Sequence, residues 1–325
     1  MHDPMFIVTG GAGLIGSNLV AALNARGHKN ILVVDHLNHP AKQENLDQLQ
    51  FTSYLDKQDF REMIQRDEPF PAQTLFHLGA CSATTETDAA YLTNNNLEYS
   101  RELCQWALAH NARFIYASSA ATYGDGGNGY VDDENALETL KPLNLYGQSK
   151  HDFDLWAKNQ GLLREIAGIK YFNVYGPGED HKGNMRSVVN KAWHQIRETG
   201  KLELFRSHRP AFADGCQQRD FLYVADAVAI TLHFLDHPEK SGIFNAGSGT
   251  PHTWLDLANA IFSAMHRAPD ISFIDIPKNI RQKYQYYTLA DIDKLRKAGF
   301  EQPFTPLDQA VSEYIAKLNR KAAIQ

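Results

Sequence analysis

The sequence is short of cysteine, of long apolar runs and of excess basic charge, and each shortage excludes a class of protein. Its three cysteines, Cys81, Cys104 and Cys216, are odd in number and widely spaced, which fits neither a disulfide framework nor a zinc site. No apolar run approaches the roughly 20 residues that a membrane-spanning helix needs. The net charge of −6 gives no electrostatic footprint for a nucleic acid.

The amino terminus also has none of the features of a secretory signal. Residues 1–4 lead directly into a short apolar run, without a basic region or a cleavage site. The 325 residues are 43% hydrophobic and 22% charged, a balance that is typical of globular proteins with one or two domains. We therefore expect a cytoplasmic protein that binds neither a membrane nor a nucleic acid.

A glycine-rich segment near the amino terminus has the pattern of a dinucleotide-binding loop. An apolar, strand-like run precedes it at 6–9, an amphipathic stretch follows at 17–26, and a second apolar run at 31–35 ends in Asp35. Glycines at such positions allow a tight turn, close approach of the backbone to a pyrophosphate, and tight packing of helix on strand. The helix amino terminus would face the phosphates and Asp35 would bind a ribose hydroxyl. The glycines are Gly10, Gly13 and Gly16.

Strand-like and helix-like segments alternate through most of the chain, which is typical of a parallel sheet covered by helices on both faces. We therefore predict an α/β fold, a Rossmann-type doubly wound parallel sheet with a smaller, mixed α/β substrate-binding lobe. The alternation breaks after residue 172 and returns near residue 222. The dinucleotide-binding domain should comprise residues 1–172 and 222–248, and the substrate-binding domain residues 173–221 and 249–325. Further strand-like runs lie at 74–80, 114–119, 168–173 and 243–249.

A tyrosine and a lysine four residues apart, Tyr146 and Lys150, suggest proton-transfer chemistry. On a helix the two side chains lie on one face, one turn apart. A free phenol has a pKa near 10, and a neighbouring ammonium lowers it. The pair arises often by chance, but it is accompanied by Ser118 and Ser119 at the end of a strand-like run. Parallel sheets bind ligands beyond the carboxyl ends of their strands, although turn chemistry alone could also explain the two serines.

Together these motifs resemble those of the extended short-chain dehydrogenases/reductases that modify nucleotide sugars. The resemblance covers nearly the whole chain, and it is strongest for the branch of nucleotide-sugar epimerases that act on an ADP-heptose. The general resemblance rests on 9–16, on Ser119 with Tyr146 and Lys150, and on 171–177, 219–221 and 245–247. The segments typical of the narrower branch are 79–82, 116–124, 181–185 and 283–285.

The resemblance implies an isomerase that uses a tightly held nicotinamide cofactor. Such an epimerase inverts carbon 6 of the heptose in ADP-D-glycero-D-manno-heptose, by transient oxidation to a ketone and return of the hydride to the opposite face. The reaction belongs to carbohydrate metabolism, in the synthesis of precursors of the lipopolysaccharide inner core. The resemblance also implies NADP as the cofactor, with NAD as the alternative, and a homo-oligomer, often a pentamer in this family.

Residue roles also follow from the resemblance, position by position. Tyr146 and Lys182 would be the acid/base pair, with Ser119 and Lys150 as the other catalytic residues. Besides the three glycines, the implied cofactor contacts are Leu14, Ile15, Asp35, His36, Lys42, Lys57, Leu78, Gly79, Ala80, Cys81, Ser82, Asn95, Tyr146, Lys150, Val174 and Lys182. The implied substrate contacts are Ser119, Asn173, Asn184, Lys191, Phe205, Arg206, Ser207, His208, Arg219 and Tyr284. No metal ligand is expected.

Cofactor preference has two interpretations. Asp35 by itself favours NAD, because a carboxylate binds a ribose hydroxyl and repels a 2′-phosphate. Protonated His36 and Lys42 could offset that repulsion as charge-assisted donors. Alternatively, Lys42 could belong to an exposed pattern of charges with Glu44 and Asp47.

Two substrate-side assignments also have alternatives. Arg219 could bind a diphosphate with its planar fork, or it could form a salt bridge with Asp220 or Asp226. His181 could replace Lys182 as the second acid/base group, because the pKa of a free histidine lies nearer neutrality.

Other functions can be weighed by what they require. Nucleotide-sugar dehydratases of this superfamily carry an Asp-Glu pair just after the strand serine, where this chain has Ala120 and Ala121. A UDP-hexose 4-epimerase, or another nucleotide-sugar enzyme of the superfamily, would share Ser119, Tyr146 and Lys150 and is the main alternative. Lys182 with its flanking residues favours the ADP-heptose enzyme. A non-catalytic dinucleotide-binding regulator would have lost one of the shared three.

Overall fold

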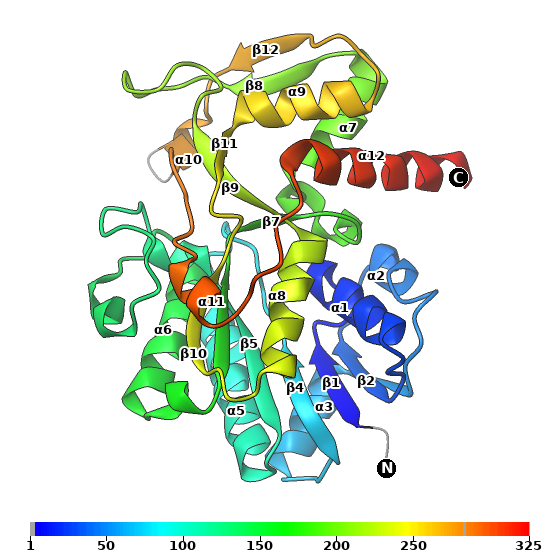
Figure 1. Ribbon diagram of the computed structural model, residues 1–325, viewed down its shortest axis with the longest axis vertical. Coiled ribbons are helices and arrows are strands. Elements are labelled where there is room, and N and C mark those ends of the chain that lie inside the picture. Colours follow the sequence, from blue (N-terminus) through cyan, green and yellow to red (C-terminus); the bar gives the residue numbers. More distant parts are fainter. Residues whose placement is uncertain (1–3, 282–283, 325) are drawn as a thin grey trace.

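A seven-stranded parallel sheet forms the larger lobe of the computed structural model, which describes residues 4–281 and 284–324 (Figure 1). Lys283, which belongs to the segment 283–285 named above, and Met1 to Asp3 lie outside the described residues. Each neighbouring pair of strands is parallel, which confirms the predicted fold class. In spatial order the strands are β10 (Gly242–Ala246), β6 (Ala167–Tyr171), β5 (Arg113–Ser119), β4 (Ala72–His77), β1 (Met5–Thr9), β2 (Ile31–Asp35) and β3 (Ser53–Asp56).

Helices cover both faces of this sheet because its central strands are apolar on both sides. One hydrophobic core lies between the sheet and α1 (Leu14–Ala25) with α8 (Val224–Asp236). A second core lies between the other face and α3 (Lys57–Gln65), α5 (Tyr99–Ala109) and α6 (Leu145–Asn159). A sheet buried on both faces needs near-continuous apolar strands, as in the fully buried β2.

The smaller lobe is mixed, as predicted, and has a hydrophobic core of its own. Its three-stranded sheet runs in the order β11 (Pro251–Thr253), β9 (Gln218–Tyr223) and β7 (Asn173–Tyr175), and its two-stranded sheet pairs β12 (Ile271–Ile274) with β8 (Leu202–Phe205). Figure 1 shows this lobe above the carboxyl ends of the large sheet. Its main helices are α7 (Val188–Thr199), α9 (Trp254–Ala264) and α12 (Leu307–Ile324).

A segment near the carboxyl terminus returns to the large sheet, which the predicted division into two domains did not include. Helix α11 (Asp293–Lys297) packs against β10. Leu295 and Phe300 belong to the core beneath the large sheet, together with α1 and α8. This stretch lies within the range 249–325 that we assigned to the other domain. It has no strand of its own in the large sheet, so the strand pattern of the sequence could not place it.

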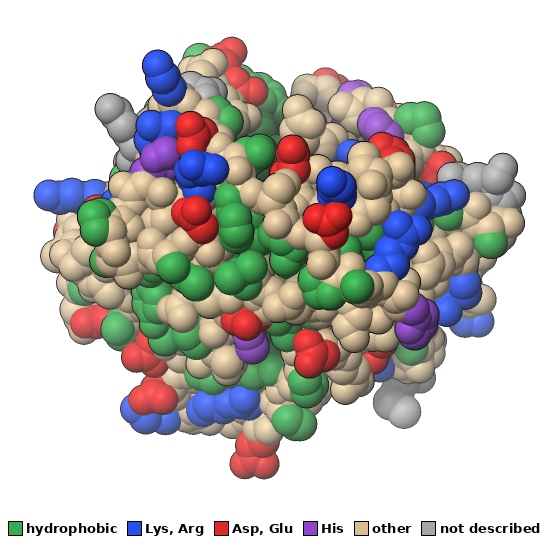
Figure 2. All heavy atoms as spheres, turned by 90° about the horizontal axis from the view of Figure 1, so that it is seen from above, with side chains coloured by type: hydrophobic (Ala, Val, Ile, Leu, Met, Phe, Trp, Pro, Cys, Tyr) green, Lys and Arg blue, Asp and Glu red, His purple; other side chains and the backbone are tan. Residues whose placement is uncertain are grey.

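Among the described residues, no helix is long and apolar enough to cross a membrane. On the face shown in Figure 2, acidic and basic side chains are interspersed among apolar and polar ones. No patch of one charge dominates this face, in agreement with the net charge of −6.

Candidate active site

A cavity of about 560 Å³ lies beyond the carboxyl ends of β1, β2, β4 and β5, where the two lobes meet. All three glycines of the amino-terminal loop flank or line it, as do the other sixteen residues implied as cofactor contacts. Ser119 and Asn173, two of the implied substrate contacts, line the same cavity. The structure therefore brings the predicted nucleotide loop and the predicted proton-transfer residues together in one place.

The glycine loop requires glycine at two points because other backbone lies against it. A Cβ atom on Gly10, whose φ is +69°, would lie 2.6 Å from the backbone nitrogen of Gly79, and one on Gly16 would lie 2.1 Å from the Gly10 carbonyl oxygen. Helix α1 begins after Gly13, which has no side chain with which to cap it. Its first N–H groups can therefore serve an anion, and the loop fits a dinucleotide pyrophosphate.

Asp35 and Lys42 form an ion pair at the end of β2. The Asp35 Oδ1 atom accepts from Lys42 Nζ at 2.7 Å and from the His36 backbone N–H at 2.7 Å, and its Oδ2 accepts from the Ala12 N–H at 2.9 Å. Lys42 therefore pairs with the predicted cofactor acid and does not belong to an exposed pattern with Glu44. Its ammonium compensates the negative charge of Asp35. The His36 side chain is directed to Asp56 instead, with 2.9 Å between His36 Nδ1 and Asp56 Oδ2.

The loop after β4 is held by an asparagine to which sequence analysis assigned no role. Asn96 Oδ1 accepts from the Cys81 N–H at 2.9 Å, and Asn96 Nδ2 donates to the Cys81 carbonyl and to Ser149 Oγ, each at 3.0 Å. Ser149 Oγ donates to the Tyr146 carbonyl at 2.8 Å. Asn96 lies in a π-helical turn, η1 (Thr93–Glu98), a geometry that recurs at functional sites. The run of three asparagines was the available signal.

Tyr146 and Ser119 lie next to each other in the wall of the cavity. Tyr146 lies in the first turn of α6, where the N-cap Asn144 accepts from the Gly147 N–H at 2.8 Å. Ser119 is the last residue of β5. Burial raises the pKa of Tyr146, and a hydrogen bond with Ser119 opposes that rise.

Lys150 lies one turn beyond Tyr146, as the sequence predicted, but its ammonium is directed elsewhere. Lys150 Nζ donates to the Ala117 carbonyl at 2.8 Å, and burial lowers the pKa of Lys150 to about 8. The pKa of Tyr146 is raised, contrary to the lowering that we expected from this lysine, and burial is the main cause. Helix α6 is fixed below this point by the fully buried ion pair of Asp154 with Lys170, at 2.6 Å.

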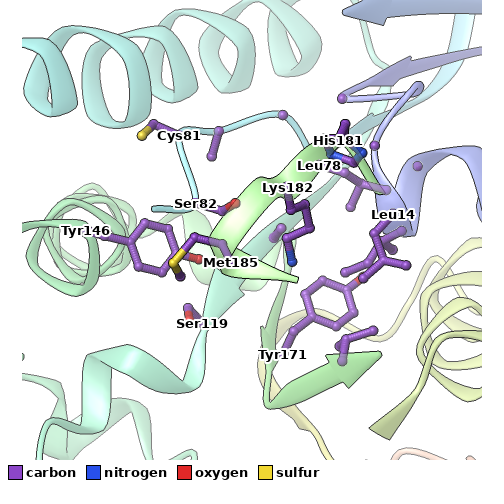
Figure 3. A pocket seen from close by; sticks show the side chains of 18 of the residues that line it. Leu14, Leu78, Cys81, Ser82, Ser119, Tyr146, Tyr171, His181, Lys182 and Met185 are labelled. Carbon is purple, nitrogen blue, oxygen red and sulfur yellow. The ribbon is translucent and has the colours of Figure 1, made fainter. Parts of the chain in front are cut away.

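Lys182 reaches the cavity from the smaller lobe. It lies in the 3₁₀ turn η5 (Asp180–Met185), in which Gly183 has a φ of +53°. Figure 3 shows its side chain and the phenol of Tyr146 projecting into the cavity from two different segments. Burial lowers the pKa of Lys182, and Glu179 opposes that effect. The amine is thus closer to a state in which it can exchange a proton near neutral pH.

His181 also lines the cavity, but its environment differs from that of its neighbour. Burial, with Lys42 and Lys182 nearby, lowers its pKa to about 4. The imidazole is therefore neutral at pH 7 and is a poor proton donor at that pH. This favours Lys182 over His181 as the second acid/base group.

Eight of the ten implied substrate contacts lie outside the cavity wall. They are Asn184, Lys191, Phe205, Arg206, Ser207, His208, Arg219 and Tyr284. Asn184 lies within the Lys182 turn itself, and Lys191 Nζ donates to its carbonyl at 3.4 Å. Arg206 and His208 lie in the loop that follows β8, and the side chains of both lie near that of Asp275.

Arg219 is buried against aromatic rings next to the cavity. Its guanidinium carbon lies 5.6 Å from the ring centre of Trp254 and 5.3 Å from that of Tyr284. Trp254 lines the cavity and donates to the Tyr284 hydroxyl at 2.9 Å. Within residues 4–281 and 284–324, no carboxylate pairs with Arg219, because Asp220 accepts from backbone and serine groups instead. The salt-bridge alternative for Arg219 is therefore not observed. No sequence pattern had pointed to Trp254.

Comparison with known proteins gives the family. The profile of the NAD dependent epimerase/dehydratase family matches residues 6–247. A protein of Nitratidesulfovibrio vulgaris (strain DP4) named ADP-L-glycero-D-manno-heptose-6-epimerase is 51% identical over 96% of this chain and 97% of its own. One of the same name from Alkalilimnicola ehrlichii is 45% identical over 96% of each chain.

Solved structures show the same fold. The Helicobacter pylori ADP-L-glycero-D-manno-heptose-6-epimerase has a TM-score of 0.80 at 23% identity, covering 98% of this chain and 96% of its own. A UDP-N-acetylglucosamine 4-epimerase from Methanobrevibacter ruminantium M1 has a TM-score of 0.83 at 23% identity, covering 99% and 100%. The family profile and the glycine cradle together assign a nicotinamide cofactor. The chain belongs to the NAD-dependent epimerase/dehydratase family and, within it, to the family of ADP-L-glycero-D-manno-heptose-6-epimerases.

Proposed function

We propose that this protein converts ADP-D-glycero-D-manno-heptose to ADP-L-glycero-D-manno-heptose by inverting carbon 6 of the heptose. The observation that carries the proposal is the placement of Tyr146 and Lys182 in one cavity with the dinucleotide loop. The names of relatives that are 51% and 45% identical to this chain support the same substrate. The product would serve the synthesis of lipopolysaccharide inner-core precursors.

The chemistry needs a hydride acceptor because the hydrogen on a secondary alcohol carbon is not acidic. A bound nicotinamide supplies the acceptance and return of that hydride. The Ser119 hydroxyl would bind the substrate oxygen, and Tyr146 would take its proton as the alcohol becomes a ketone. Lys150, fixed on the same helix face, would hold the ribose next to the nicotinamide. The net reaction is an isomerisation, so no external acceptor is consumed.

Inversion also needs the ketone to present both faces of one carbon to a fixed nicotinamide. The ketone must therefore rotate between loss and return of the hydride, and its oxygen then moves away from Tyr146. Lys182, which enters the cavity from the other lobe, would protonate the oxygen in the second orientation. Two groups from different segments solve this geometric problem more directly than one.

The function is tested by incubating the protein with ADP-D-glycero-D-manno-heptose and following the carbon-6 configuration by proton NMR. We expect conversion to the L-glycero epimer until the two epimers reach equilibrium, without addition of a nicotinamide cofactor. UDP-glucose serves as the control substrate, and we expect no inversion of its carbon 4. Inversion of UDP-glucose alone would establish the UDP-hexose 4-epimerase alternative, whose solved examples share this fold. Inertness towards both sugars would indicate a dinucleotide-binding regulator.

NADP is the cofactor that we propose in preference to NAD, because Lys42 already compensates the charge of Asp35. Lys42→Ala should weaken NADP binding by roughly one to two orders of magnitude, since charge-assisted hydrogen bonds contribute about 1.5–3 kcal/mol. It should leave NAD binding nearly unchanged. The measurement is titration of apoprotein with each dinucleotide, together with mass spectrometry of the cofactor released on denaturation. A released cofactor without the 2′-phosphate, with Lys42→Ala binding normally, would contradict the proposal.

Arg219 is proposed to bind the substrate diphosphate from its aromatic surroundings. Arg219→Lys keeps the positive charge but loses the planar fork that matches phosphate oxygens and stacks on aromatic rings. We expect KM for the ADP-sugar to rise at least about tenfold, which corresponds to one lost charge-assisted hydrogen bond, with a much smaller fall in kcat. Steady-state kinetics at several ADP-sugar concentrations measures the split. An unchanged KM would remove Arg219 from the substrate site.

Assembly and location follow from the family resemblance. We propose a cytoplasmic homo-oligomer, with a pentamer as the expected form. Sedimentation velocity of the purified protein should give a mass of a multiple of the 36.6 kDa chain. A protein that sediments only as a single chain would contradict the proposed assembly.

A further inference from the structure

The segment that carries Lys182 is poorly suited to hold a catalytic group by itself. It is a short 3₁₀ turn, interrupted at Gly183 and preceded by Gly176 and Gly178, all three with positive φ. Glycine has the largest backbone freedom to lose on folding. A catalytic group must nevertheless be held within about 0.5 Å of its productive position. Contacts from outside the turn must supply that order.

The first of these contacts is made at Glu179, just before the turn. Glu179 is completely buried, with an exposed fraction of 0%. Its carboxylate accepts from the Ser187 N–H and the Ser187 hydroxyl, each at 2.6 Å, and from the Tyr314 hydroxyl at 2.8 Å. Ser187 is the N-cap of α7, and Tyr314 lies in α12. Three donors from two helices thus fix the beginning of the Lys182 turn.

The second contact is made at Asp180, the first residue of the turn. Its carboxylate accepts from Asn190 Nδ2 at 2.9 Å and from Lys321 Nζ at 2.7 Å. The same lysine pairs with Glu44 at 2.7 Å. Asn190 also donates to the Tyr314 hydroxyl at 2.9 Å, which joins the two contacts into one network.

Glu44 connects this network to the cofactor side of the cavity. It ends α2 (Pro40–Glu44), the short helix that also carries Lys42. Figure 1 shows the carboxyl-terminal part of α12 over α2, and the ion pairs of Lys321 connect them. The next residue, Asn45, donates to the carbonyls of Ala12 and Gly178, each at 2.9 Å. The nucleotide loop, α2 and the Lys182 turn are therefore fastened to one another.

We propose that Tyr314 and Lys321 of α12 are positioning residues for Lys182, because they hold the two acidic residues at the start of its turn. Neither side chain lines the cavity, so each acts through Glu179 or Asp180. The inference rests on the proposed role of Lys182 as the second acid/base group. Glu179 supports this role of Lys182, since its carboxylate raises the pKa of Lys182 against the effect of burial. Holding Glu179 in place thus keeps the amine protonatable as well as correctly directed.

The test is the double variant Tyr314→Phe/Lys321→Met. Phenylalanine keeps the packing of the tyrosine ring, and Lys321 is 41% exposed, so both changes remove polar contacts and little else. We expect kcat for epimerisation to fall by about tenfold to a hundredfold, as displacements of about 1 Å do, with cofactor retained and KM little changed. Lys317→Met, an exposed lysine one turn earlier on α12, is the matched control and should keep the normal kcat. Lys321→Arg should also keep it, since arginine can bridge the same two carboxylates.

A mutant cycle separates positioning from a general structural effect. An aldehyde analogue of the substrate can disproportionate, with water, to the alcohol and the carboxylate, and in a Lys182→Met background this reaction would depend on Tyr146. If Tyr314 and Lys321 act through Lys182, the double variant should not lower this residual rate further, so the changes are non-additive. A further fall in that background, or a normal kcat in the double variant, overturns the inference. If the double variant does not fold, Lys321→Met alone carries the same test with a smaller fall in kcat.

These outcomes are distinct from failure of the proposed function. If Lys182→Met epimerises normally, the two-group mechanism is wrong and this inference is overturned with it. If Lys182→Met is inactive while the α12 variants are normal, only the positioning role is wrong.

Discussion

Replacing Tyr146 with phenylalanine is expected to lower kcat for epimerisation by roughly 10²–10⁴-fold, the usual contribution of a general acid/base group. The change removes a single oxygen, the one that hydrogen-bonds Ser119 in the cavity. It leaves the ring and the start of α6 intact, so the fold and the bound cofactor should be retained. The rate is measured by proton NMR with ADP-D-glycero-D-manno-heptose, and the cofactor by absorbance after denaturation.

Ser119→Ala is the companion variant for this prediction. Ser119 would orient the substrate oxygen but exchange no proton, so its loss should lower kcat by less than the loss of the phenol. A Tyr146→Phe protein whose kcat stays within about tenfold of the wild-type value would fall below the range for a general acid/base. Tyr146 would then be a packing residue.

The parts of this protein that the sequence predicted are those with local patterns. The glycine loop, the acid at the end of β2 and the strand-end serine each lie within one strand–turn–helix unit. Their mutual placement follows from a general property of parallel sheets, in which the carboxyl ends of the strands meet at one edge. The seven-stranded sheet confirmed the predicted fold class. The implied cofactor contacts, from Leu14 to Lys182, line the cavity at that edge.

The parts that the sequence did not predict depend on contacts between distant segments. Lys42 could be assigned to the exposed surface or to the cofactor, and only its 2.7 Å contact with Asp35 decides between them. Asn96 acts through a π-helical turn, and no residue pattern distinguishes such a turn from ordinary helix. The pairing of Lys321 with Asp180 and Glu44 joins three segments far apart in the chain. Charged pairs of this kind carry no periodic pattern.

The cavity lining accounts for fewer of the residues on the substrate side. All ten implied substrate contacts were carried over by resemblance, and eight of them lie outside the cavity wall. Four of these eight, Arg206, Ser207, His208 and Tyr284, lie in loops, which are the most variable elements of a fold, so position-by-position transfer is weakest there. Among these eight residues, Arg219 is the one whose surroundings indicate a ligand. It is buried with no carboxylate partner among the described residues, and such a charge needs compensation. A diphosphate would supply that compensation.

Replacing Lys182 with methionine is expected to abolish net epimerisation, with kcat reduced by roughly 10²–10⁴-fold, while the cofactor stays bound. Methionine keeps an unbranched side chain of similar length but cannot exchange a proton. Tyr146 and Ser119 remain, so the first oxidation can still occur from one epimer. The ketone can then rotate, but no group remains to protonate its oxygen in the second orientation. Hydride therefore returns to the face from which it left.

This failure has a specific appearance that separates it from loss of the fold. The aldehyde analogue should still disproportionate, since Tyr146 suffices for it. Lys201→Met, an exposed lysine outside the cavity, controls for the loss of a charge and should epimerise normally. A Lys182→Met protein with a near-normal rate of epimerisation would leave Tyr146 as the acid/base for both faces, and rotation of the ketone would then have to return its oxygen to the same phenol.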